Sequence, residues 1–144
     1  MRVLVLHGPN LNLLGEREPE IYGTQTLAQL NDAIAAAAEE LGLEIRCEQY
    51  NAEGAIVDAL QVARTTYSGV VINPGAYAHY SYAIADAIAA IGIPTIEVHL
   101  SNVAAREPFR RVSVTASACR GVVSGLGATG YALALRALRD MVER

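Results

Sequence analysis

The sequence predicts an α/β fold in which a five-stranded parallel sheet lies between two layers of helices. Short segments rich in Val and Ile alternate with segments of helical spacing along the whole chain. Several of the short segments are apolar enough to be covered on both faces, which is typical of parallel strands. Strands and helices that alternate in this way form right-handed crossovers. We therefore expect a flavodoxin-like three-layer sandwich that residues 1–144 form as a single domain.

Five short apolar runs are the expected strands: Arg2–Leu6, Glu44–Tyr50, Gly69–Asn73, Thr95–Leu100 and Gly121–Ser124. The first expected helix begins at a possible capping box of Thr26 and Gln29 and ends at Gly42. The apolar positions of the four helices are Leu27, Leu30, Ile34 and Leu41; Ile56, Leu60 and Ala63; Ile84, Ile88 and Ile91; and Leu135, Leu138 and Val142.

Composition narrows the possible functions. No apolar segment approaches the roughly 20 residues that span a bilayer, and the start lacks the features of a secretory signal, so we expect a cytoplasmic protein without a membrane partner. The net charge of -4 argues against nucleic acid as a partner. All 11 basic residues are Arg. The lack of Lys excludes Schiff-base chemistry, a lysine-linked pyridoxal cofactor and a Walker-type phosphate loop.

Polar side chains follow three of the expected strands, at the edge where ligands bind in such folds. Asn10, Arg17 and Tyr22 follow the first strand, residues 73–79 end and follow the third, and residues 97–102 end the fourth. Individually, the Asn residues could be turn formers, Tyr22 a buried loop anchor and His79 a contact at a helix start. Their convergence on one edge indicates a binding site for a small molecule.

Glu97 and His99 form the most informative pair. Residues two apart on a strand point to the same face, so the carboxylate can hold one imidazole nitrogen while the other faces a ligand. A charged pair in an apolar strand costs desolvation, which makes a purely structural role less favourable. No helical His pair or Cys spacing typical of a metal site is present, so no metal is predicted. Cys47 and Cys119 are isolated and expected to be reduced and buried.

Without Lys or a metal, a proton must be moved by His, Tyr or a carboxylate. A tyrosine phenol, with a reference pKa of about 10, is a poor base unless a cation stabilises the phenolate. Arg17 lies in the same segment as Tyr22 and keeps its charge, so the two form a plausible phenolate base. A strong base opposite an acid such as His99 suits an elimination from a hydroxy-ketone. Asn10 could stabilise the enolate intermediate, directly or through water.

The segment Gly125-Leu126-Gly127-Ala128-Thr129-Gly130 matches the G-x-G-x-x-G pattern of dinucleotide sites. That fingerprint requires a following strand with an acidic residue about 20 positions later, which the sequence does not provide. These glycines are instead expected to form a tight turn and to allow the last helix to pack closely.

Several longer motifs resemble those of the type II 3-dehydroquinate dehydratases. They are Gly8-Pro9-Asn10-Leu11-Asn12-Leu13-Leu14-Gly15, Arg17-Glu18-Pro19, Tyr22-Gly23, Asn73-Pro74-Gly75-Ala76-Tyr77 with His79, Glu97-Val98-His99-Leu100-Ser101-Asn102 and Arg106-Glu107-Pro108-Phe109-Arg110. The resemblance covers essentially the whole chain. It implies cofactor-free dehydration of 3-dehydroquinate to 3-dehydroshikimate in the shikimate pathway, by anti elimination through an enolate.

The resemblance also implies roles for individual residues. Tyr22 would be the base, tuned by Arg17; Asn10 would help stabilise the enolate; and His99 would be the acid, held by Glu97. The residues expected to bind substrate are Asn73, Leu100 and Ser101 at the carboxylate, the latter two partly through backbone N–H groups, and His79 and Arg110 at ring hydroxyls. A homododecamer built as a tetramer of trimers is implied, with Asp86 matching an acid lent to a neighbouring subunit's site.

Five residues depart from the usual family pattern: His7, Ala52, Ala78, Val112 and Val114. None removes a proposed catalytic group. The main alternative function is a non-catalytic flavodoxin-like module that binds a small anionic metabolite or phosphate through glycine-rich turns. A response-regulator receiver is disfavoured, because it would need an acidic cluster after the first strand and a Lys near the end.

The connection from Gly8 to Gly23 is unusually long for a compact domain, and such connections are usually functional. We expect a structureless segment that acts as a lid. Asn10 would stay fixed at the strand end, while Arg17 and Tyr22 would arrive only when the segment closes over substrate.

Overall fold

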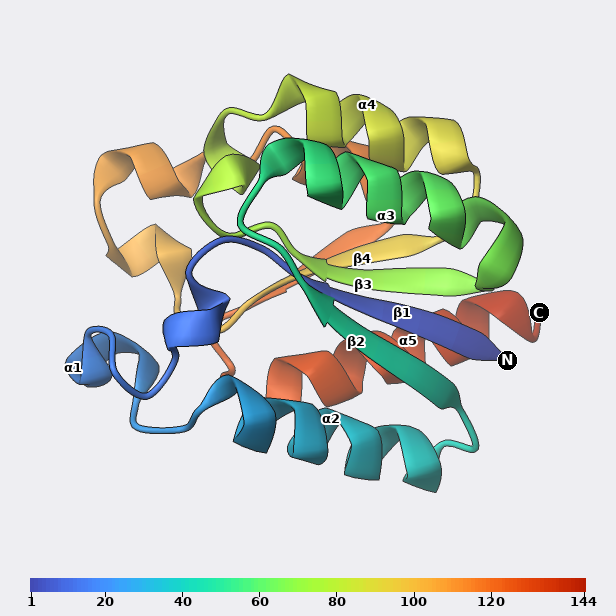
Figure 1. The fold of residues 1–144 in the computed structure, drawn as a ribbon, viewed down its shortest axis with the longest axis horizontal. Coiled ribbons are helices and arrows are strands. Elements are labelled where there is room, and N and C mark those ends of the chain that lie inside the picture. The colour runs from blue at the N-terminus through green and yellow to red at the C-terminus, as the bar shows by residue number, and fades with distance from the viewer.

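The computed structural model describes residues 1–144 and confirms the predicted flavodoxin-like sandwich. Its parallel strands pair in the order β2-β1-β3-β4-β5 (Figure 1). The strand bounds are β1 Arg2–His7, β2 Glu44–Gln49, β3 Gly69–Asn73, β4 Thr95–His99 and β5 Gly121–Ser124. Every predicted strand is present, with ends that differ from the prediction by one residue at most.

Two pairs of helices cover the two faces of the sheet (Figure 1). The long helices are α2 Leu27–Glu40, α3 Glu53–Thr66, α4 Tyr82–Ile91 and α5 Thr129–Val142. Helices α2 and α5 pack on one face, where Val3 and Val5 of β1 point, and α3 and α4 pack on the other, where Leu4 and Leu6 point. This alternation explains why the central strands are apolar at every position: both faces are buried.

The helix ends follow the predicted signals. Thr26 and Gln29 form the capping box, each side chain accepting a hydrogen bond from the other's backbone N–H. Gly42 follows α2 with a φ of 69°, in the left-handed region that favours glycine. Leu135, Leu138 and Val142 all lie in α5, as predicted; Leu135 and Leu138 are buried, and Val142, the last residue of the helix, is exposed. None of the helices is long and apolar enough to cross a membrane.

The connection between β1 and α2 is not structureless, which corrects the prediction for Gly8–Gly23. A 3-10 turn at Leu11–Leu13 follows β1, and the one-turn helix α1 spans Pro19–Tyr22. Leu11 and Leu14 are buried against the core formed with α2 and α5, and they fix the first half of the connection to the sheet. Arg17 and Tyr22 lie at the pocket in this structure, so movement of this segment as a lid stays a prediction.

Two close approaches shape the edge of the sheet where the strands end. The backbone of Gly8 lies against Pro74, and a Cβ at Gly8 would come within 2.6 Å of the Pro74 carbonyl carbon and oxygen. At the glycine-rich turn, Gly125 has a φ of 86° and Gly130 lies against Val123. This arrangement agrees with the predicted tight turn and close packing of the last helix.

Cys47 and Cys119 are free thiols, and both are half-buried.

Candidate active site

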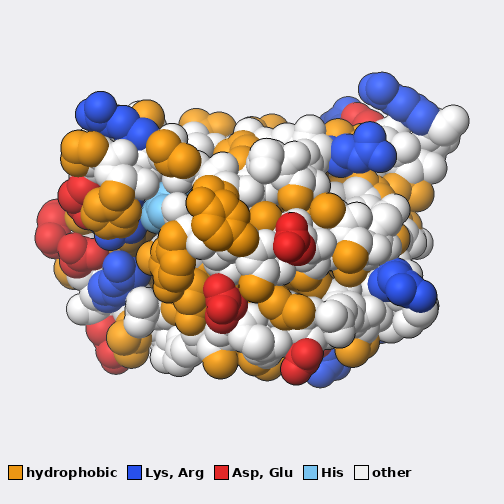
Figure 2. Space-filling model, turned by 90° about the horizontal axis from the view of Figure 1, so that it is seen from above, with side chains coloured by type: hydrophobic (Ala, Val, Ile, Leu, Met, Phe, Trp, Pro, Cys, Tyr) orange, Lys and Arg blue, Asp and Glu red, His pale blue; other side chains and the backbone are white.

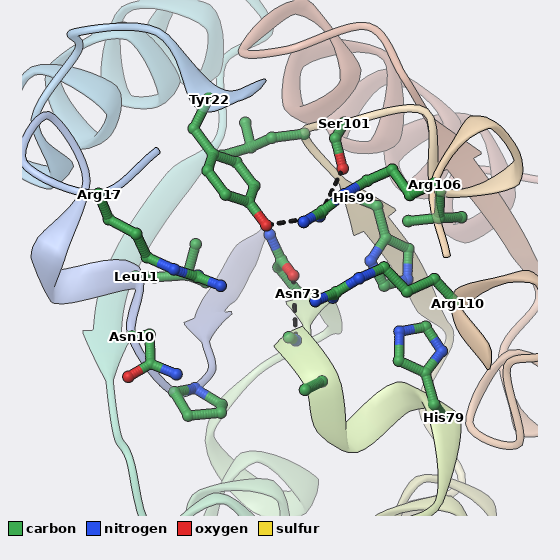
Figure 3. A pocket seen from close by; sticks show the side chains of 15 residues that line it. Asn10, Leu11, Arg17, Tyr22, Asn73, His79, His99, Ser101, Arg106 and Arg110 are labelled. Carbon is green, nitrogen blue, oxygen red and sulfur yellow. Dashed lines mark hydrogen bonds between the residues drawn. The ribbon is translucent and has the colours of Figure 1, made fainter. Parts of the chain in front are cut away.

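A pocket lies at the carboxyl ends of β1, β3 and β4, where the sequence predicted a site (Figure 3). Segments from across the chain meet there. The side chains that line it are Pro9, Asn10, Leu11, Arg17, Tyr22, Asn73, Gly75, Ala76, His79, His99, Leu100, Ser101, Val103, Arg106 and Arg110.

Glu97 and His99 form the predicted pair at the end of β4. His99 Nε2 lies 2.8 Å from Glu97 Oε2, and both residues are buried. The Glu97 carboxylate also accepts hydrogen bonds from the hydroxyls of Thr115 and Ser113. Burial alone would raise the pKa of Glu97, but these three hydrogen bonds, with His99 first among them, hold it below its usual value.

The direction of the Glu97–His99 hydrogen bond defines what His99 can do. Because an ionised carboxylate only accepts, His99 Nε2 carries the proton in this contact. His99 Nδ1 is the other ring nitrogen, and His99 lines the pocket. The carboxylate therefore orients the ring at the pocket, as an acid that faces a ligand requires.

Tyr22 lies at the pocket with two guanidinium groups beside it (Figure 3). Arg106 donates a hydrogen bond from Nη1 to the Tyr22 hydroxyl oxygen at 2.6 Å. The guanidinium carbons of Arg106 and Arg17 lie 5.2 and 5.0 Å from the centre of the Tyr22 ring. Arg106 therefore contacts the phenol oxygen directly, whereas the predicted partner Arg17 lies over the ring.

Arg106 is the functional residue that the sequence reasoning missed. It belongs to one of the recognised motifs, but no role was predicted for it. Arg106 Nη1 also lies 3.3 Å from Ser101 Oγ, and the side chain is only 10% exposed. One sequence signal was available, because an Arg five residues after Ser101 follows the same strand end as Glu97 and His99.

Asn73, Leu100 and Ser101 present hydrogen-bonding groups along one wall of the pocket. Asn73 Oδ1 accepts a hydrogen bond from the Gly75 N–H, and its Nδ2 donates to the Tyr131 hydroxyl. The backbone N–H groups of Leu100 and Ser101 have no acceptor within the chain. Free N–H groups beside an amide are suited to a carboxylate.

His79, Arg110 and Asn10 complete the predicted set in the pocket. His79 Nδ1 lies 2.7 Å from the Val112 carbonyl oxygen, and the His79 ring stacks 6.4 Å from that of His99. Arg110 donates to Glu107 at 2.8 Å. Asn10 has a left-handed backbone with a φ of 69°, a conformation that Asn tolerates, and its N–H donates to the Asn51 side chain.

Two predicted site residues are not among those that line the pocket: Glu97, which is buried and holds His99, and Asp86. Asp86 is on α4 with an exposed side chain. Among the departures from the family pattern, Ala52 precedes α3 without a side-chain cap, Ala78 is buried and Val112 is exposed.

The charge of the pocket is opposite in sign to that of the whole chain. Arg17, Arg106 and Arg110 all line it, although the net charge is -4. Glu18 lies near Arg17 and Arg106, and Glu107 near Arg106 and Arg110; neither Glu lines the pocket. Because the arginines outnumber these carboxylates, the pocket favours an anionic ligand.

Comparisons with known proteins identify the family of this chain. A family model described as dehydroquinase class II matches residues 1–139. This chain belongs to the class II dehydroquinase family. The resemblance inferred from the sequence motifs is therefore confirmed.

Individual relatives cover almost the whole chain. A protein named 3-dehydroquinate dehydratase from Pelotomaculum thermopropionicum is 58% identical over 137 residues, which are 95% of this chain and 95% of that protein. One of the same name from Anoxybacillus flavithermus is 54% identical and spans 99% of this chain and 97% of that protein. The crystal structure of type II dehydroquinase from Butyrivibrio crossotus superposes with a TM-score of 0.94 at 48% identity, covering 96% of this chain and 97% of that one.

Proposed function

We propose that the protein is a 3-dehydroquinate dehydratase that removes water from 3-dehydroquinate to give 3-dehydroshikimate, a step of the shikimate pathway. Membership of the class II dehydroquinase family supports the reaction. The observation that carries the mechanism is the presence in one pocket of a tyrosine held by Arg106 and a histidine held by Glu97.

In the proposed mechanism, Tyr22 acts as the base. Its phenolate, stabilised by Arg106 and Arg17, takes a proton from the carbon next to the ketone of the substrate. The electron pair of that C–H bond moves into the ketone to form an enolate. Asn10 stabilises the enolate oxygen directly or through a bound water.

The second half of the reaction expels the hydroxyl group on the opposite face of the ring. As the enolate collapses, the C–O bond breaks and the His99 Nδ1–H group gives its proton to the departing hydroxyl, which leaves as water. Glu97 stabilises the imidazolium before this transfer and keeps the ring in place. Tyr22 then returns its proton to solvent and His99 takes one up, so that no cofactor is consumed.

The remaining residues of the pocket bind the substrate. Asn73 and the free N–H groups of Leu100 and Ser101 receive the carboxylate. His79 and Arg110 contact the ring hydroxyls. The excess of arginines favours this anionic substrate in an acidic protein.

The activity is tested by adding 3-dehydroquinate to protein freed of metal with a chelator and following the absorbance of the conjugated enone product. Tyr22→Phe is expected to fold normally and to lose at least about 1,000-fold in kcat, within the range of removing a catalytic base. Tyr50→Phe is the matched control, because its hydroxyl donates to Glu48 outside the pocket. Folded wild-type protein without enone formation would refute the function. Full activity of Tyr22→Phe would refute only the assignment of the base.

The same proposal includes an assembly of trimers into a dodecamer, in which Asp86 completes a neighbouring subunit's site. Asp86 on α4 is exposed, and so are the large aromatic side chains of Tyr80 and Tyr82 at the start of that helix, at 60% and 72%. Figure 2 shows hydrophobic side chains spread over the surface that α3 and α4 form. Such apolar surface supports a contact between subunits.

Mixing variants tests the role of Asp86 across subunits. Asp86→Asn and Tyr22→Phe are each expected to be nearly inactive alone, whereas subunits unfolded together and reassembled regain activity, because some sites then contain both intact residues. Sedimentation velocity measures the assembly. A monomer with full activity, or an Asp86→Asn variant as active as wild type, would contradict this part of the proposal.

A further inference from the structure

Hydrogen bonds join four polar side chains, of which Asn73 lines the pocket, His7 and Tyr131 are fully buried and Asn31 is half-buried. His7 and Asn73 are register partners at the ends of β1 and β3. The hydroxyl of Tyr131, from α5, lies 3.1 Å from Asn73 Nδ2 and 3.4 Å from His7 Nδ1. His7 Nε2 lies 2.8 Å from Oδ1 of Asn31, on α2. We call these four residues the buried relay.

The chemistry of each group sets the direction of the hydrogen bonds. Asn31 Oδ1 can only accept, so His7 Nε2 carries a proton. Burial lowers the pKa of His7 to about 4, against a smaller opposing effect of the Asn31 hydrogen bond, so the ring is neutral near pH 7. Its Nδ1 is then an acceptor, and the Tyr131 hydroxyl donates to it across the longest link of the relay. The Tyr131 oxygen in turn accepts from Asn73.

One end of the relay, Asn73, lines the pocket, and the other end, Asn31, is half-buried on α2. His7 and Tyr131 are 0% exposed, and Asn73 is the only one of these three that lines the pocket. The Asn73 amide donates one N–H to the Tyr131 hydroxyl, and its oxygen accepts a hydrogen bond from the backbone N–H of Gly75. The amide therefore cannot turn over without losing both partners, and a single N–H group remains for a ligand.

The alternative is that these polar groups merely satisfy one another. Their neighbours on the same face of the sheet, Val5 and Val71, are apolar, and apolar residues could have filled the same space without the desolvation cost of an imidazole, a phenol and an amide. Two fully buried polar side chains, His7 and Tyr131, that hold the pocket residue Asn73 are better explained by orientation of that amide.

We infer that Tyr131 and His7 are positioning residues that aim the free N–H of Asn73 at the carboxylate of the bound substrate. This inference rests on the proposed function for the identity of the ligand. Tyr131 acts directly on Asn73, and His7 acts only through the Tyr131 hydroxyl, whose proton it accepts.

Tyr131→Phe tests the inference, because it removes one hydroxyl and keeps the buried ring. KM for 3-dehydroquinate is expected to rise about tenfold with a smaller change in kcat, within the range for the loss of a hydrogen bond to a charged group. His7→Leu should act in the same direction, and the double variant should be no worse than Tyr131→Phe alone. Thr95→Val is the control, since it removes a buried hydroxyl at the opposite end of the sheet.

A binding measurement distinguishes a specific loss of Asn73 orientation from a general loss of order in the binding site. Calorimetry measures the affinity of two unreactive ligands: the substrate ring with its ketone reduced, and the same ring with the carboxylate replaced by hydroxymethyl. Tyr131→Phe should weaken the first about tenfold and the second less than twofold. Equal weakening of both, or no weakening, would overturn the inference. Wild-type protein that binds these ligands but forms no enone would refute the proposed function and leave this comparison intact.

Discussion

Acidification is expected to destabilise the protein through His7. Desolvation lowers the pKa of His7 from its usual 6.5 to about 4 in the folded protein. Between these two values the unfolded chain binds a proton at His7 and the folded chain does not. The unfolded state therefore takes up more protons as the pH falls, and the free energy of unfolding decreases with it.

The size of the effect follows from the two pKa values. At about 1.4 kcal/mol for each pKa unit, the difference between 6.5 and about 4 corresponds to about 3 kcal/mol of unfolding free energy. This loss is absent at pH 7, develops below pH 6.5 and is complete near pH 4. Tyr131, the other titratable group in contact with the ring, has a pKa raised by burial and stays neutral throughout this window.

Urea unfolding at several pH values between 7 and 4.5, at one protein concentration, measures the effect. The comparison is with His7→Leu, which lacks the titrating ring but keeps every other ionisable group. Glu97, with its lowered pKa, also loses stabilising ionisation in acid, but it does so in both proteins and cancels in the difference. The wild type should lose about 2 to 3 kcal/mol more than His7→Leu over this range. If the free energy of unfolding decreased equally with pH in the two proteins, the reasoning would be refuted.

Three further variants test the site and its frame. Arg106→Gln should move the rise of kcat/KM with pH to higher pH and cost about 100-fold at pH 7, because the phenolate loses the cation at its oxygen; an unchanged pH profile would contradict this role. Glu97→Gln should lower kcat about 100-fold with little change in KM, and a loss below threefold in steady-state assays would argue against His99 as an acid held by this carboxylate. Gly8→Ala should lower the free energy of unfolding by about 1 to 3 kcal/mol, because the added Cβ would clash with the Pro74 carbonyl group. A urea unfolding curve identical to that of the wild type would show that the backbone moves to accommodate the Cβ without cost.

The order of strands and helices could be predicted because period and position are local properties of the sequence. Apolar runs about five residues long that alternate with helical spacing are sufficient to indicate a parallel sheet, and the capping box at Thr26 marked the start of α2. The helix α1 could not be predicted in the same way. At four residues it is too short to show a period, and its formation depends on tertiary contacts of the segment that Leu11 and Leu14 fix to the core.

The candidate site could be predicted where local geometry determines side-chain direction. Glu97 and His99 share a face because they are two apart on one strand. Arg106 lies after a 3-10 turn in a segment without periodicity, so its direction toward Tyr22 could not be derived from spacing. The buried relay could not be predicted from the sequence either. His7 and Tyr131 are 124 positions apart, and each lies at an ordinary core position of its own element.

The two proposed catalytic groups must hold opposite charges in the same small pocket, and their partners explain how. As the base, Tyr22 must be an anion, and two cations contact it: Arg17 at its ring, and Arg106 at its ring and oxygen. His99 must be a cation, and its buried partner is the Glu97 carboxylate, itself kept ionised by Thr115 and Ser113. The buried relay, to which Asn73 belongs, is uncharged near pH 7. It can therefore orient the substrate carboxylate without altering the electrostatic field that separates base from acid.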